Sequence, residues 1–278
     1  MAPRLLRIHT ENADYQHIET LRRNRNKRQR HREFFVEGVR PINLALRHGW
    51  QVNAFVYSRE RPLSDWAAGI LARSNARLHV ELPLRLLAQL SLKEETSELL
   101  AVVAMPEDRL ERIPARQNPL VVVFDRPGSP GNLGTLIRSC DALGADGLVI
   151  TGHACDLYDP ETIRASTGSL FALPAVRLPS HTALAPWLER LRADHPRLQI
   201  VATDEKGERT ASEHDFTRPT VLLLGNETWG LSAAYRALAD VTVRIPITGA
   251  ASSLNVAVAG SILLYEAGRQ RAAGAGGA

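Results

Sequence analysis

Six runs of apolar residues in the second half of the chain constrain its fold more than any other feature. They lie at 120–124, 147–151, 172–178, 198–203, 220–225 and 241–247, and segments with helical periodicity separate most of them. Continuous apolar runs of this length are typical of strands that are buried on both faces of a parallel sheet. We therefore predict an α/β domain over residues 119–271, with a mostly parallel six-stranded sheet covered by helices.

The first half of the chain has shorter strand and helix patterns, which predict a smaller α/β/α domain over residues 33–105. The segment 106–118 is charged and contains two prolines, so we expect a linker between the two domains. Residues 1–32 are predicted to form an arm and a polar helix. Residues 272–278 contain only Gly and Ala, which predicts a disordered tail.

Positive charge is concentrated near the N-terminus, although the net charge of the whole chain is only +4. One stretch of eleven residues contains no acid and seven basic side chains, namely Arg22, Arg23, Arg25, Lys27, Arg28, Arg30 and Arg32. Charges at this density repel one another unless solvent or phosphates neutralise them. The run therefore predicts a surface that binds a polyanion, and the alternative is a solvated helix face.

Metal sites, disulfides and membrane segments are not expected. The only cysteines, Cys140 and Cys155, form no C-x-x-C pair, and the nine histidines show no ligand spacing such as H-x-x-x-H. The N-terminus lacks the apolar core of a signal peptide, and no apolar run approaches the length of a membrane span. We expect a soluble, cytoplasmic protein.

Three polar segments follow strands of the predicted parallel sheet. The carboxyl ends of parallel strands meet at one edge, where α/β proteins bind their ligands. We therefore expect the three loops to converge on one site. Its candidate side chains are Asn132 and Arg138 after the first strand, Glu227 in a G-N-E-T-W-G loop, and Ser253 and Asn255 after a loop of small residues.

For several of these residues, the pattern leaves a structural alternative open. Glu227 is either a general acid or base, or a carboxylate that stabilises a helix N-terminus. Asn255 either contacts a ligand or caps the helix that we expect to begin at Leu254. In that helix Val258, Ile262 and Tyr265 continue an apolar stripe from Leu254. Arg138, taken alone, is compatible with an ordinary surface arginine.

The glycine-rich turn after the first strand argues against two nucleotide-binding classes. Its glycines are spaced G-x-x-G-x-x-G instead of G-x-G-x-x-G, and no acid ends the second strand, which weakens the case for a dinucleotide oxidoreductase. A P-loop is excluded, because no G-K-[ST] follows the glycines.

Taken together, the three segments resemble the motifs of the SpoU, or TrmH, branch of the SPOUT methyltransferases. The pattern N-x-G-x-x-x-R is met by Asn132, Gly134 and Arg138. The pattern L-G-N-E-x-x-G-L is met by residues 224–231, and I-P-x-x-G-x-x-x-S-L-N-V by residues 245–256. The chain departs from the family at Thr228 and Trp229, where smaller residues are frequent, and at Ile247, where Met is common.

The resemblance implies an RNA ribose 2'-O-methyltransferase that uses S-adenosylmethionine, forms a homodimer and contains a deep trefoil knot. It also implies that the N-terminal domain is an L30e-like domain that binds the RNA substrate. The implied catalytic residues are Arg138, Asn132, Asn255, Ser253 and Glu227. The implied cofactor-binding residues are Thr203, Leu224, Gly225, Asn226, Gly230, Ile245, Ile247, Leu254 and Asn255.

In the family, the arginine at position 138 is proposed to activate the ribose hydroxyl. A guanidinium normally stays protonated, so a literal arginine base is physically unfavourable. We hypothesise that Arg138 binds the adjacent phosphate and stabilises developing alkoxide charge, and leave the base unassigned. Ribosomal RNA is the favoured substrate, since antibiotic-resistance enzymes of actinomycetes share this two-domain plan. Transfer RNA methylation and a catalytically silent RNA-binding role are the alternatives.

Overall fold

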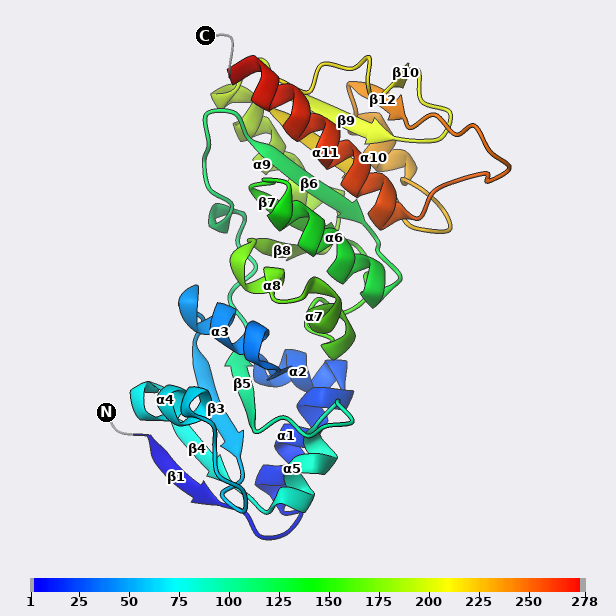
Figure 1. The fold of residues 1–278 in the computed structure, drawn as a ribbon. Helices are drawn as coiled ribbons and strands as arrows, with labels where there is room; N and C mark the ends of the chain where they lie inside the picture. Colours follow the sequence, from blue (N-terminus) through cyan, green and yellow to red (C-terminus); the bar gives the residue numbers. More distant parts are fainter. Residues whose placement is uncertain (1–2, 276–278) are drawn as a thin grey trace. The chain divides into compact units, whose positions relative to one another are not determined.

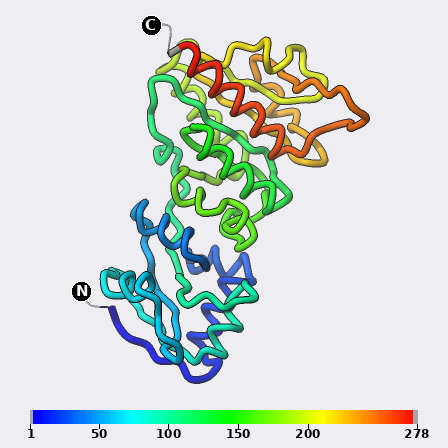
Figure 2. The backbone as a smooth tube through the Cα atoms, viewed as in Figure 1, coloured from blue at the N-terminus to red at the C-terminus, as the bar shows by residue number. Residues whose placement is uncertain are grey.

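The computed structural model describes residues 3–275, which divide into two compact units (Figures 1 and 2). Unit 1 contains the chain as far as Glu107 together with Tyr158–Ala172. Unit 2 contains Asp108–Leu157 and the chain from Leu173 onward. Within residues 3–275, no helix combines the length and apolar character that crossing a membrane requires.

Unit 2 is built on a seven-stranded sheet with the strand order β10-β12-β9-β11-β6-β7-β8. Every pairing between neighbouring strands is parallel, as predicted. The strands are β6 (Leu120–Asp125), β7 (Gly147–Thr151), β8 (Ala175–Leu178), β9 (Gln199–Thr203), β10 (Arg209–Thr210), β11 (Thr220–Leu224) and β12 (Val241–Arg244). The prediction of six strands missed β10, because two polar residues at a sheet edge leave no hydrophobic pattern.

Helices cover the sheet of unit 2, and two of them pack against each other beside the central strands (Figure 1). The helices are η1 (Leu110–Arg112), α6 (Pro130–Ala142), α9 (His181–Asp194), α10 (Ala233–Leu238) and α11 (Val256–Ala275). In Figure 2 the red trace of α11 runs beside the green trace of α6. A Cβ atom at Gly260 would lie 2.7 Å from Leu136 Cδ1 and 2.8 Å from Leu224 Cδ1. Glycine therefore allows α11 to approach α6 and β11 closely.

The apolar stripe predicted for α11 faces solvent and not the core. Leu254, Val258, Ile262 and Tyr265 are 37%, 45%, 39% and 62% exposed. The buried side of the helix consists instead of Ala257, Gly260, Leu263, Leu264 and Ala267. A helix that is apolar on both sides has a second face available for burial.

Unit 1 is built on a mixed five-stranded sheet with the order β1-β4-β3-β5-β2. Its strands are β1 (Arg4–Arg7), β2 (Glu33–Glu37), β3 (Val52–Tyr57), β4 (Leu78–Glu81) and β5 (Leu99–Ala104). Its helices are α1 (Ala13–Arg23), α2 (Arg25–His31), α3 (Val39–Arg47), α4 (Asp65–Arg73), α5 (Leu84–Leu90), α7 (Pro160–Ser166) and α8 (Ser169–Ala172). The expected alternation of strands and helices is therefore present.

The predicted N-terminal arm is part of the folded unit. Strand β1 pairs in parallel with β4, and Tyr15, Ile18 and Leu21 of α1 are buried in the core. The single helix expected through Arg32 is broken at Asn24, whose side chain accepts a hydrogen bond from the Lys27 amide and so caps a new helix.

Two predicted boundaries also differ from the structure. Leu110 and Ile113, in the expected linker, are buried in the core of unit 2, so these few apolar residues anchor the segment. Helix α11 continues through Ala275, so residues 272–275 of the expected tail are helical, and the remainder of that tail lies outside the described residues.

Arg28 is a further correction, because it does not belong to the basic surface. Its side chain is only 2% exposed and donates to the carbonyl oxygens of Leu21 and Arg22. It also pairs with the Asp159 carboxylate at 3.1 Å. The other basic side chains of the run are tolerated near Arg28 because its guanidinium is neutralised by Asp159 and hydrogen-bonded to two carbonyl oxygens. By contrast, Arg23, Arg25, Lys27, Arg30 and Arg32 are exposed.

Candidate functional site

A pocket of about 580 Å³ lies at the carboxyl ends of β9, β11 and β12 in unit 2. This is within the size range of small-molecule sites. Most of the predicted site residues line it, namely Asn132, Thr203, Gly225, Asn226, Glu227, Gly230, Ile245, Ile247, Ser253, Leu254 and Asn255. The three loops therefore converge, as the parallel sheet predicted.

A chain of hydrogen bonds joins the three loops through their side chains. Asn132 Nδ2 donates to Glu227 Oε1 at 3.1 Å, and Asn255 Nδ2 donates to Asn132 Oδ1 at 2.9 Å. Asn132 lies in the first turn of α6, Glu227 lies in the second loop, and Asn255 caps α11 at the end of the third loop. The amide of Asn132 thus fixes the spacing between the second and third loops.

Glu227 also binds the turn that precedes α6. Its Oε2 accepts from the Gly128 amide at 2.9 Å, and its Oε1 from the Ser129 amide at 3.2 Å. Partial burial by itself raises the pKa of this carboxyl, but the hydrogen bonds from Gly128, Asn132 and Ser129 outweigh it, and the pKa lies below its ordinary value. An ionised, fully engaged carboxylate is suited to positioning the turn and is a weak general base. Ser129, and not Asn132, caps α6, because the Ser129 hydroxyl accepts a hydrogen bond from the Asn132 amide.

The second loop is a tight turn in which two glycines are required. Asn226 and Gly230 exchange backbone hydrogen bonds of 3.1 and 2.9 Å, and Gly230 has a φ of +64°. A Cβ atom at Gly225 would lie 2.2 Å from the Leu231 nitrogen. The Asn226 side chain donates to the Arg126 carbonyl and accepts from the amides of Thr228 and Trp229. Asn226 therefore shapes the loop with both ends of its side chain.

The third loop has an unusual main chain. Among the described residues, its backbone from 246 to 254 makes no hydrogen bond to another residue. Several of these residues line the pocket, including Ile247, Ser253 and Leu254. Their amides and carbonyls are therefore available to a ligand. A ligand that excludes water from the pocket has to bond to these groups, because unpaired backbone groups are costly when they are removed from water.

Asn255 caps α11, which is one of its two predicted alternatives, and its contact with a ligand stays a prediction. Its Oδ1 accepts from the amides of Ala257 and Val258 at 2.9 and 3.3 Å and so caps α11, which begins at Val256 and not at Leu254. Its Nδ2 reaches Asn132 across the pocket. The cap thereby orients the amide that connects the two loops.

Two predicted residues do not line the pocket. Leu224 is buried beneath it, 1% exposed, where its side chain supports Gly260. Arg138 is exposed on α6 and forms no ion pair or hydrogen bond within residues 3–275. Thr203 lines the pocket, but its hydroxyl donates to the Leu223 carbonyl at 3.0 Å.

Five polar or aromatic residues of the lining were not predicted from the sequence, namely Asp204, Glu205, Thr228, Trp229 and Arg236. Trp229 is 75% exposed at the tip of the second loop. Its departure from the family pattern was the only signal for it. Arg236 lies 3.9 Å from Asp204, so both charges are present at one side of the pocket. No cluster of three or more His, Cys, Asp or Glu suited to a metal ion occurs among residues 3–275.

Comparison with protein families gives two matches that follow the two domains. The family model described as SpoU rRNA Methylase family matches residues 119–265, and the one described as SpoU L30e-like domain matches residues 12–101. The chain belongs to the SpoU rRNA methylase family. The predicted family and the predicted combination of an α/β methyltransferase domain with an L30e-like domain are thereby confirmed.

Two relatives of this SpoU protein cover nearly its whole length. It is 52% identical over 273 residues to the 23S rRNA (uridine(2479)-2'-O)-methyltransferase of Streptomyces viridochromogenes, covering 98% of this chain and 95% of the relative. It is 30% identical over 260 residues to the 23S rRNA (guanosine(2553)-2'-O)-methyltransferase of Bacillus subtilis, covering 92% and 97%.

Solved structures of SpoU proteins have the same fold. The SpoU methyltransferase AviRb from Streptomyces viridochromogenes, in complex with the cofactor AdoMet, matches with a TM-score of 0.89 and 52% identity over 94% of this chain and 98% of that one. An AdoMet-bound rRNA methyltransferase from Sinorhizobium meliloti matches with a TM-score of 0.83 and 31% identity over 95% and 98%.

Proposed function

We propose that this SpoU protein transfers a methyl group from S-adenosylmethionine to a ribose 2'-hydroxyl of 23S rRNA in the cytoplasm. The observation that carries the proposal is the convergence of the three family motifs on one pocket, where Asn132, Glu227 and Asn255 are joined by hydrogen bonds. The two relatives described above are named for this reaction on 23S rRNA.

The pocket fits the proposed cofactor. Adenine and the methionine chain offer donors and acceptors but no phosphate, and the free main chain of residues 246–254 can match them. Ile245, Ile247 and Leu254 supply apolar surface for the adenine ring. Arg236 and Asp204 carry the charges that a zwitterionic amino acid group requires. When bound, S-adenosylmethionine supplies an electrophilic methyl group.

The chain's own residues then have to orient the ribose and remove its hydroxyl proton. Asn132 and Asn255 are oriented beside the pocket by their mutual hydrogen bond. We assign Arg138 to the phosphate next to the target ribose and to the charge that develops on the attacking oxygen. The group that accepts the proton is not assigned, because Glu227 is already engaged by three donors.

Arg138 and the exposed face of α11 both favour a homodimer. Arg138 does not line the pocket of its own chain, and the helix that carries it packs against α11. The uncovered stripe of Leu254, Val258, Ile262 and Tyr265 provides apolar surface for a second copy. A two-fold interface along α6 and α11 would bring Arg138 of one copy toward the pocket of the other. The close packing of α11 on α6 is also compatible with the implied trefoil knot.

Contact with RNA is assigned to two exposed features. Arg23, Lys27 and Arg30 lie on the surface of α1 and α2, where they can neutralise phosphates. The Trp229 ring projects beside the pocket and offers a stacking surface for a base near the target nucleotide. Stacking requires an unpaired base, so we expect the target to lie in a loop or bulge of the rRNA.

Nucleoside mass spectrometry and reverse transcription test the proposal. Unmodified 23S rRNA and bulk tRNA are incubated with the enzyme and labelled S-adenosylmethionine, and stops at low nucleotide concentration then locate the methylated ribose. One 2'-O-methylated nucleotide in 23S rRNA is expected. Methylation of tRNA alone, methylation of a base, or no transfer would overturn the proposal. The implied link to antibiotic resistance is tested by the growth of cells that express the enzyme on drugs that bind the large ribosomal subunit.

A further inference from the structure

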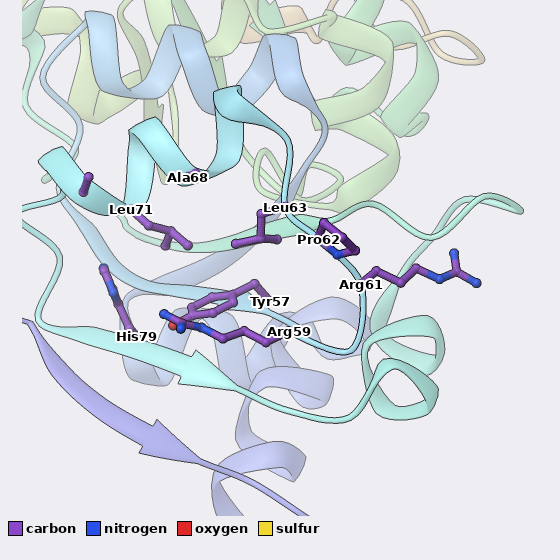
Figure 3. A pocket seen from close by; sticks show the side chains of 9 residues that line it. Tyr57, Arg59, Arg61, Pro62, Leu63, Ala68, Leu71 and His79 are labelled. Carbon is purple, nitrogen blue, oxygen red and sulfur yellow. The ribbon is translucent and has the colours of Figure 1, made fainter.

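Unit 1 contains a second pocket, of about 560 Å³, between β3, β4, helix α4 and the loop that joins β3 to α4 (Figure 3). This volume accommodates a molecule the size of a nucleotide. The pocket is formed by residues of unit 1 alone and takes no part in the methyl-transfer site described above.

One wall of this pocket is formed by the Arg59 guanidinium, which lies over the aromatic ring of Tyr57. Tyr57, at the end of β3, is 1% exposed, and the Arg59 guanidinium carbon lies 6.0 Å from its ring centroid. Arg59 also pairs with Glu81 at 3.5 Å, yet its side chain stays 69% exposed. A guanidinium plane that is held in this way is a stacking surface for a planar base.

The opposite wall is apolar. Figure 3 shows Leu63 and Leu71 across the space from Tyr57 and Arg59. Aliphatic side chains on one side and a planar cation on the other leave a slot that suits a flat, weakly polar ring.

A polar atom without a partner lies at one end of the slot. His79 Nε2 is buried and has no hydrogen-bond partner among residues 3–275. Burial lowers the pKa of His79, so the ring is neutral at pH 7 and can donate or accept one hydrogen bond through this nitrogen. A buried polar atom without a partner is costly, and the edge of a base would satisfy it.

A positive charge lies at the other end. Arg61 is exposed and forms no ion pair or hydrogen bond among the described residues. No acidic side chain lines the pocket. A phosphate at this end would therefore meet attraction from Arg61, whereas Glu81 partly neutralises the charge of Arg59.

We propose that this pocket binds one unstacked nucleotide of the RNA substrate other than the nucleotide that is methylated. Its base lies between Arg59 and Leu71, its edge bonds to His79 Nε2, and its phosphate bonds to Arg61. The inference rests on the proposed function, because it takes the ligand to be part of the RNA that is methylated. Unit 1 would then recognise one specific unpaired base in addition to binding phosphates.

The test compares the paired substitution Arg59→Ala and Arg61→Ala, and separately His79→Leu, with the matched control Arg47→Ala. Arg47 is an exposed arginine of α3 that does not line the pocket. We expect the paired variant to bind RNA about tenfold more weakly, and His79→Leu to bind it several-fold more weakly. S-adenosylmethionine affinity and kcat at saturating RNA should stay within about twofold of wild type, since the transfer site is untouched. RNA affinity equal to that of Arg47→Ala would overturn the proposal.

Calorimetry with AMP, GMP, CMP and UMP separates an RNA-held nucleotide from a free one. An RNA-held nucleotide predicts no saturable binding below about 1 mM, because a single mononucleotide forms too few contacts. Saturable binding below that concentration, lost in the paired variant while its RNA affinity is unchanged, would contradict the inference. If wild-type enzyme methylates no RNA, the proposed function fails. If wild type methylates and the variants bind RNA as the control does, only the second pocket fails.

Discussion

Glu227 illustrates how one residue can hold a site together without performing its chemistry. Its carboxylate accepts hydrogen bonds from two amides of the turn before α6 and from Asn132. Asn132 in turn accepts from Asn255, which caps α11. The residue type, the motif and the meeting of the loops were predicted from the sequence, but the partner and direction of each hydrogen bond depend on the exact positions of loops about 100 residues apart.

A pH dependence of stability follows from the lowered pKa of Glu227. Because the folded-state pKa lies below the ordinary value of 4.5, the ionised carboxylate stabilises the fold above that value, and this contribution is lost as the pH falls through the folded-state pKa. Between about pH 5 and pH 3, Glu227→Gln should lose less stability than wild type. Urea denaturation at each pH measures this. The exposed Glu189→Gln is the control, and equal acid sensitivity of wild type and Glu227→Gln would contradict the account.

Gly225 provides a second test at this scale. A methyl group there would meet the Leu231 nitrogen at 2.2 Å and the Gly230 carbonyl carbon at 2.3 Å, so Gly225→Ala has to displace the second loop. We expect loss of S-adenosylmethionine binding and a destabilisation of about 1–3 kcal/mol. Gly249→Ala in the third loop is the control, since nothing lies within 4 Å of its Cβ position. Calorimetry and thermal denaturation of both variants distinguish them; normal cofactor affinity in Gly225→Ala would show that the loop is adaptable.

Helix α11 contacts its surroundings through its N-terminal cap and through two different faces. Its N-terminal cap reaches the pocket, its buried face packs on α6, and its other face leaves an apolar stripe uncovered. The sequence predicted the stripe correctly by its spacing but could not show which side faced the core. The reason is that the buried side combines Leu263 and Leu264 with Gly260 and two alanines, whose small size lets α11 approach α6 closely.

The exposed stripe predicts that dimerisation depends on α11. Ile262→Asp places a charge in the proposed apolar interface and should convert the dimer to a monomer, because burying an unpaired carboxylate is costly. Light scattering after gel filtration measures the mass. Val39→Asp makes the same kind of change at another exposed apolar position, 53% exposed on α3, and should leave the mass unchanged. If Ile262→Asp has the same mass as the wild type, α11 does not form the interface.

Helix α2 contains one buried arginine, Arg28, beside basic side chains that face solvent. Arg28→Ala removes the partner of Asp159 and two carbonyl contacts, and should cost roughly 3 kcal/mol of stability. Lys27→Ala and Arg30→Ala should change stability by less than about 0.5 kcal/mol. Instead, each should weaken RNA binding and reduce its salt dependence by about one phosphate contact. Denaturation measures the stability of each variant, and RNA titrations at several salt concentrations measure the salt dependence of its RNA affinity. An unchanged salt dependence in the Lys27 and Arg30 variants would show that the basic run does not bind RNA.

At the scale of the whole molecule, the sequence predicted what depends on local pattern. The buried strands of unit 2 follow from the hydrophobic runs, and the meeting of three loops at one sheet edge follows from the parallel topology that those runs predict. The path of the chain between units did not follow. Tyr158–Ala172 belongs to unit 1, where Trp50 Nε1 donates to the Phe171 carbonyl, and the apolar pattern of a helix does not show which core it joins.

Turnover and cofactor affinity of the Arg138→Ala variant, measured together, decide whether Arg138 acts on the ribose and not on the cofactor. Arg138 lies outside the cofactor pocket, and we propose that it contacts the reacting ribose and its phosphate. Calorimetry should therefore give a dissociation constant for S-adenosylmethionine within about twofold of wild type, while methyl transfer to 23S rRNA falls by at least about 1000-fold. Turnover within a few fold of wild type, or loss of cofactor binding together with activity, would contradict this proposal.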